Sequence, residues 1–199
     1  DNLISYQLRQ FILKLPCLEI LVLTNNDLWG VDSVWLSKLL RGLKSLKELH
    51  ITQQHIHNDS FGRENGWATL RSAIESLDFL EVLNLSHTLF SAYNVSTALE
   101  IIGMLSEMKS LKVLNLSNGC ISNLSNGCIS NNNYKALVEI LYNLNLCVLD
   151  VSYNIIDEHA YEEFKQVFIS MKTLKCIKVP FRCPYLKDYG FKDCSKYHK

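Results

Sequence analysis

The sequence lacks an excess of charge of either sign. Lysine and arginine together number 20, aspartate and glutamate together also number 20, and the formal net charge is zero. A nucleic-acid footprint needs a basic excess or a basic stripe, and no basic run occurs here. A neutral chain also has no electrostatic attraction to anionic lipid. We therefore expect neither a nucleic-acid partner nor a membrane partner.

Long apolar runs are also missing. No stretch approaches the roughly 18 residues that would span a bilayer, and no charged-then-apolar leader stands at the start. The chain opens with Asp1 rather than Met, so it is compatible with a portion of a larger protein.

Motifs that carry catalysis are absent as well. There is no Gly-rich phosphate loop, no G-x-S-x-G elbow and no H-E-x-x-H. His55 and His57 are two residues apart, and His50 could approach His87 from an adjoining strand, but no cysteine or carboxylate completes a spaced ligand set. We expect no enzymatic activity, no cofactor and no metal.

The cysteines do not form an obvious disulfide framework. There are seven, an odd number, and several occupy positions where a small apolar residue would serve. Reduced thiols and a cytoplasmic location are therefore predicted. The alternative is an oxidising compartment, in which Cys183 and Cys194 could pair.

What the chain does contain is a repeat. Residues 111–121 read LKVLNLSNGCI, which has the spacing L-x-x-L-x-L-x-x-N/C-x-L with Gly in the Asn position. The start-to-start steps are 28, 34, 31, 35 and 28 residues, so the base period is about 28 with insertions. The last copy decays, with Arg182 in the Asn position, and is interpreted as a terminal cap. The copies begin at Leu18, Leu46, Leu80, Leu111, Leu146 and Leu174.

This pattern resembles the leucine-rich-repeat (LRR) family over nearly the whole chain, roughly 18–179. Between the short strands, apolar residues fall three or four apart, as at Leu137, Leu141 and Leu144, which predicts an amphipathic helix in each coil. Strand plus helix resembles the ribonuclease-inhibitor type found in NOD-like receptor tails. The resemblance implies an α/β solenoid of about five to six repeats, with a curved parallel sheet on the concave face and helices on the convex face.

We predict one solenoid domain over residues 1–199. Residues 1–16 form an N-terminal helix or cap, 17–179 the repeats, and 180–199 a C-terminal cap and tail. The polar segment 57–66 is predicted to be an inserted loop, and the second NLSNGCIS, at 123–130, a looped-out duplication. For both segments the alternative is a loop that contacts a partner.

In this fold the outward strand side chains form the concave face, where repeat proteins of this type usually bind. We expect that face to be polar and hydroxyl-rich, without an enclosed cavity. Asp150 and Lys178 are expected to form a surface ion pair, and Tyr153 and Phe181 either to anchor an interface or to pack under the tail. The predicted partner-binding residues are His50, Thr52, Asn84, Ser86, His87, Asn115, Ser117, Asp150, Tyr153, Lys178 and Phe181.

The resulting hypothesis is a non-enzymatic protein–protein interaction module. One alternative is the substrate-recognition portion of a larger ligase, GTPase activator or NOD-like receptor, and another is a structural subunit of a large assembly. The frame itself requires the inward leucines of successive coils to lie side by side in one buried line. They are Leu49, Leu83, Leu114 and Leu149.

Overall fold

The computed structural model describes residue 7 and residues 10–24, 30–52, 66–87, 95–118, 131–154 and 158–179. The predicted loop up to residue 65, the duplication at 123–130 and the tail at 180–199 lie outside these residues. The strands are β1 (Ile20–Thr24), β2 (Glu48–Thr52), β3 (Val82–Asn84), β4 (Val113–Asn115), β5 (Val148–Asp150) and β6 (Cys176–Lys178). The helices are α2 (Gly30–Leu40), α3 (Gly66–Ile74), α4 (Val95–Glu107), α5 (Asn131–Asn143) and α6 (Glu158–Ser170).

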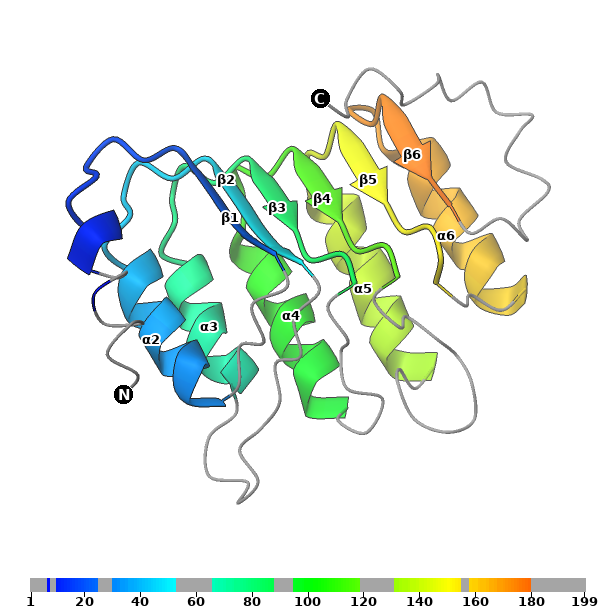
Figure 1. Ribbon diagram of the computed structural model, residues 1–199. Helices are drawn as coiled ribbons and strands as arrows, with labels where there is room; N and C mark the ends of the chain where they lie inside the picture. The colour runs from blue at the N-terminus through cyan, green and yellow to red at the C-terminus, as the bar shows by residue number, and fades with distance from the viewer. Residues whose placement is uncertain are drawn as a thin grey trace.

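The strands form a single parallel sheet in the order of the chain, β1-β2-β3-β4-β5-β6. All the labelled helices lie on one side of it, as the two layers of Figure 1 show. Neighbouring helices need about 8–10 Å of separation, whereas neighbouring strands are about 4.8 Å apart, so the sheet occupies the inner side of the curve. The predicted α/β leucine-rich-repeat solenoid is therefore confirmed.

The inward position at the centre of each strand forms the buried line that the repeat frame requires. Leu49 is in register with Leu83, Leu83 with Leu114, and Leu114 with Leu149. These four side chains are 0% exposed. The helices close the other side of the core, because their residues at three- and four-residue spacing are buried, including Leu39, Leu70, Leu141 and Phe164.

A second ladder runs where each coil turns into its strand. The carbonyl of Glu19 accepts hydrogen bonds from the N–H groups of Lys47 (2.8 Å) and Glu48 (2.9 Å) of the next coil. The same forked bond recurs at the carbonyls of Lys47, Glu81, Lys112 and Cys147. Buried backbone that would otherwise lack partners is satisfied in this way from coil to coil.

The repeat asparagine binds backbone groups in the fifth coil. Asn154 is 5% exposed, and its Nδ2 donates to the carbonyls of Leu116 (2.9 Å), Val151 (2.9 Å) and Ser152 (3.3 Å). One side chain thus ties the turn of its own coil to the coil before it. The equivalent positions Gln54, Thr88 and Gly119 lie outside the described residues.

Cysteine chemistry differs from the sequence expectation at one position. Cys17 and Cys147 are free thiols, but Cys176 on β6 is disulfide-bonded, and its partner is not among the described residues. The prediction of reduced thiols is therefore wrong at Cys176. Separately, none of the helices in the described ranges is long and apolar enough to cross a membrane.

Truncating the buried line should be strongly destabilising. Leu114→Ala removes a side chain that is 0% exposed, so we expect the free energy of unfolding in urea to fall by about 3 kcal/mol. Val22→Ala is the control, because Val22 is 57% exposed, and it should cost less than about 0.5 kcal/mol. Similar losses in both variants would contradict the stacked core.

The donor role of Asn154 can be tested separately from its shape. Asn154→Ala leaves the carbonyls of Leu116 and Val151 without this donor and should cost about 2 kcal/mol in urea unfolding. Asn154→Asp keeps the shape but places a carboxylate oxygen against those carbonyls, so it should cost at least as much. If Asn154→Asp left the free energy of unfolding unchanged, the amide would not be the important group.

Candidate functional site

The outward side chains of the sheet fall into rows, because side chains at i and i+2 of a strand share a face. The second row is the one predicted to bind a partner, and the strand register confirms its members: Val22, His50, Asn84, Asn115, Asp150 and Lys178. Two residues earlier lies a first row: Ile20, Glu48, Val82, Val113, Val148 and Cys176. Two residues later lies a third row: Thr24, Thr52, Ser86, Ser117 and Ser152.

Polar side chains of the second row accept hydrogen bonds from the backbone at the ends of their own strands. Oδ1 of Asn84 accepts from the N–H of Ser86 at 3.0 Å, and Oδ1 of Asn115 accepts from the N–H of Ser117 at 2.9 Å. A bond from the side chain to the amide two residues on is an Asx turn, which redirects the chain. These side chains therefore have a backbone role, whether or not they also meet a partner.

His50 is held in one orientation by Asn84. Nδ2 of Asn84 lies 3.3 Å from Nδ1 of His50, and Asn84 cannot flip without losing its bond from Ser86. An amide nitrogen only donates, so Nδ1 of His50 is the acceptor and the ring proton sits on Nε2. That nitrogen faces Oε2 of Glu48 at 3.6 Å, which is beyond a good hydrogen bond.

The third row is less available than predicted. Thr52, Ser86 and Ser117 are only 7–9% exposed, so the face is not hydroxyl-rich to a partner. Oγ1 of Thr52 donates to Oγ1 of Thr24 at 3.0 Å across the strands. Sequence spacing places these side chains on the outward face but does not reveal that they are buried.

Asp150 and Lys178 do pair, but not as a surface ion pair. The Asp150 side chain is 9% exposed, and its Oδ2 lies 3.3 Å from Nζ of Lys178. Its Oδ1 accepts from the N–H (3.0 Å) and Oγ (2.6 Å) of Ser152. Burial with three donors makes Asp150 a turn-forming residue first and an ion-pair partner second.

The residues that follow Ser86, Ser117 and Ser152 of the third row have a left-handed backbone. His87, Asn118 and Tyr153 have φ values of 54°, 50° and 57°. Asn118 and His87 also meet through Nδ2 and Nδ1 at 2.8 Å. Tyr153 is 78% exposed, and the tail under which it was alternatively expected to pack lies outside the described residues. Phe181, its predicted neighbour, lies outside the described residues.

The concave face is hollowed over β2 to β5. The hollow has a volume of about 260 Å³, and Val82, Val113 and Val148 of the first row lie along it. Sequence reasoning missed this apolar row, although the alternation of the strands could have found it. The predicted residues that line the hollow are His50, Asn84, Asn115, Asp150 and Lys178.

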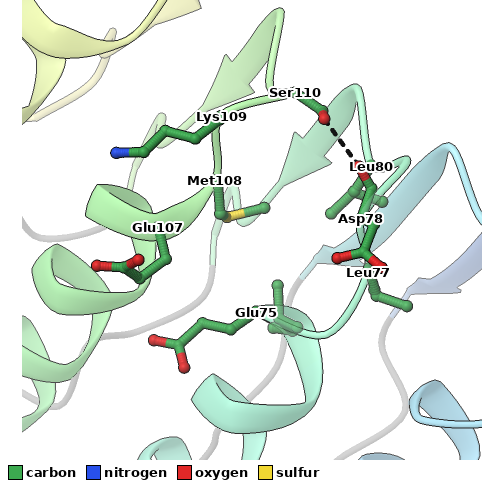
Figure 2. Close-up of a pocket in the computed structure, with 9 residues that line it drawn as sticks. Glu75, Leu77, Asp78, Leu80, Glu107, Met108, Lys109 and Ser110 are labelled. Atoms are coloured by element: carbon green, nitrogen blue, oxygen red, sulfur yellow. Dashed lines mark hydrogen bonds between the residues drawn. The ribbon is translucent and has the colours of Figure 1, made fainter.

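A second hollow of about 220 Å³ lies at the ends of α3 and α4 and the turns that follow them. Figure 2 shows Ser110 bonded across it to the carbonyl of Asp78, at 2.8 Å. Glu75 lines it but is held by Nε of Arg71 at 2.6 Å. In the described ranges no three His, Cys, Asp or Glu side chains form a group that could hold a metal ion.

No protein-family model matches the chain, and no curated protein does. Solved structures do resemble it. Leiomodin-1 actin-binding site 2 is 17% identical, with a TM-score of 0.53, covering 76% of this chain and 79% of that one. Internalin C2 from Listeria monocytogenes is 14% identical, with a TM-score of 0.43 and coverages of 86% and 64%. A TLR13–ssRNA13 complex is 16% identical, with a TM-score of 0.24 and coverages of 88% and 37%.

Together with the parallel sheet and the register of the repeats, the likeness to the leiomodin structure defines the class of this protein. It is an α/β leucine-rich-repeat solenoid. At this level of identity the likeness concerns the fold alone, so function has to be argued from the concave face.

Changes at Asp150 can separate its turn role from its charge. Asp150→Asn keeps an acceptor for the N–H of Ser152, and the neighbouring coil already uses Asn115 at this position, so we expect a cost below about 1 kcal/mol in urea unfolding. Asp150→Ala leaves the Ser152 donors without an acceptor and should cost about 2–3 kcal/mol. Equal costs would mean that the pair with Lys178 dominates.

Proposed function

We propose that this chain is a protein-binding module that engages its partner through the concave sheet. The observation that carries the proposal is the hollow of about 260 Å³ across β2 to β5, which combines an apolar valine row with a polar row beside it. An apolar centre with a polar rim is the usual anatomy of a protein interface. The partner-binding residues that this proposal retains at the hollow are His50, Asn84, Asn115, Asp150 and Lys178.

A protein suits this surface better than a small molecule. The floor of the hollow is one layer of sheet, whereas small-molecule sites bury most of the ligand in a cleft. Exposed apolar side chains continue beyond the hollow, because Ile20 and Val22 on β1 are 51% and 57% exposed. Tyr153, 78% exposed, adds an aromatic of the kind that anchors interfaces. A partner of extended shape could use all of these together.

The proposed role is binding without catalysis, and the proposed subtype is the ribonuclease-inhibitor-like one. The subtype is supported by an α-helix between every two consecutive described strands. A cytoplasmic location stays a prediction: the free thiols of Cys17 and Cys147 favour it, and the disulfide of Cys176 argues against it.

Affinity capture with chemical cross-linking and mass spectrometry tests the proposal. Val113→Arg places a long cation in the hollow, and Tyr142→Arg makes a matched change on α5, where Tyr142 is 57% exposed. We expect Val113→Arg to reduce recovery of the specific partner by about tenfold or more, and Tyr142→Arg to leave it unchanged. Both variants should keep the wild-type circular dichroism spectrum.

The opposite result has a definite meaning. If Tyr142→Arg abolishes capture and Val113→Arg does not, the convex helices form the interface. That outcome would favour the alternative in which the chain is a structural subunit of a large assembly. Capture of a partner that carries a catalytic domain would instead favour the substrate-recognition alternative.

A further inference from the structure

The carboxylate of Glu48 stands alone among the charges around the hollow. Glu19 pairs with Lys47 and Glu81 with Lys112, each at 2.6 Å between Nζ and Oε1. The hydrogen bond that Lys47 donates to Glu19 raises the pKa of Lys47, as expected of a tight pair. Glu48 lines the hollow with 39% of its side chain exposed, and within the described chain no lysine or arginine pairs with it.

The nearest ionisable side chain is that of His50, whose Nε2 lies 3.6 Å from Oε2 of Glu48, beyond a good hydrogen bond. Nδ1 of the same ring is turned to Nδ2 of Asn84 instead. Glu48 therefore carries an uncompensated negative charge. It does so within the first row, where its neighbours on both sides are the apolar side chains of Ile20 and Val82.

A partner that covers the first row also buries the carboxylate of Glu48. Burying a carboxylate against a neutral surface strips it of water without a replacement, and the penalty falls on binding. A partner that supplies a cation avoids the penalty and gains a charge-assisted hydrogen bond. Glu48 thus selects against partners that lack a cation, because such partners lose binding free energy when they bury its carboxylate.

Resting on the proposed function, we infer that the hollow binds an extended peptide segment with a lysine or arginine at Glu48 and an aliphatic side chain over Val113. Strands in this sheet are about 4.8 Å apart, so Glu48 on β2 is about 10 Å from Val113 on β4. The stem of a lysine or arginine, about 6 Å long, can lie along Val82 and reach Glu48.

The spacing within the peptide follows from the same dimensions. In an extended segment, residues i and i+2 share a face and lie about 6.6 Å apart. With the basic Cα placed over β3, the residue two positions away falls beyond the next strand, β4, so that its side chain can lie over Val113. The expected pattern is therefore a basic residue and a Val, Ile or Leu separated by one residue, in either chain direction.

Selection from a phage-displayed library of random 12-residue peptides tests this pattern, followed by fluorescence anisotropy on the enriched peptide. We expect wild type to enrich the basic-x-aliphatic pattern. Glu48→Lys should weaken binding of the enriched peptide on the order of tenfold, because it replaces an attraction to the basic residue of the peptide with a repulsion. The control Glu139→Lys makes the same change in net charge on an exposed position of α5 and should leave affinity unchanged.

The outcomes separate this inference from the function on which it rests. If Glu48→Lys binds the enriched peptide as tightly as wild type while Val113→Arg abolishes binding, the charge pattern is wrong and the concave interface stands. Should Val113→Arg also bind as wild type, or should no peptide be enriched, both the inference and the proposed interface are overturned.

Discussion

The stacking of one buried aliphatic side chain per coil on the same position of the next coil is the interaction on which this structure depends. Leu49, Leu83 and Leu114 are in register and fully buried. Because side chains alternate along a strand, the burial of this line also decides which residues face outward. A slip of one residue would turn Asn84 inward and leave its amide without the bonds it now makes, so the register is strongly specified.

The repeated coil imposes the same backbone requirements at each step, and polar side chains meet many of them. Asn84, Asn115 and Asp150 each accept the N–H two residues on, and Asn154 spans the turns of two coils. Residues that look like surface candidates are in this way partly committed to the fold. The valines of the first row make no such bonds through their side chains, and Val82 and Val113 are partly exposed, whereas Val148 is buried at 7% exposure.

A chain with no net charge can still select its partners by the charge at a single position. The chain has no net charge, and several carboxylates are neutralised by lysines of the neighbouring coil. Glu48 differs because the position next to it on β3 is Val82 rather than a basic residue. Net charge limits the classes of partner that long-range electrostatic steering can attract. The choice among protein partners depends instead on the charge at single positions such as Glu48.

The sequence by itself determined the repeat frame, the parallel order of the strands and the outward row from His50 to Lys178. It could do so because a fixed period and strand alternation place these residues without knowledge of distances. Only the tertiary structure decided that Thr52, Ser86 and Ser117 are buried, that Tyr153 is exposed and that a hollow lies over β2 to β5. These features depend on how the coils pack against one another and how far they curve, which spacing along the chain does not specify.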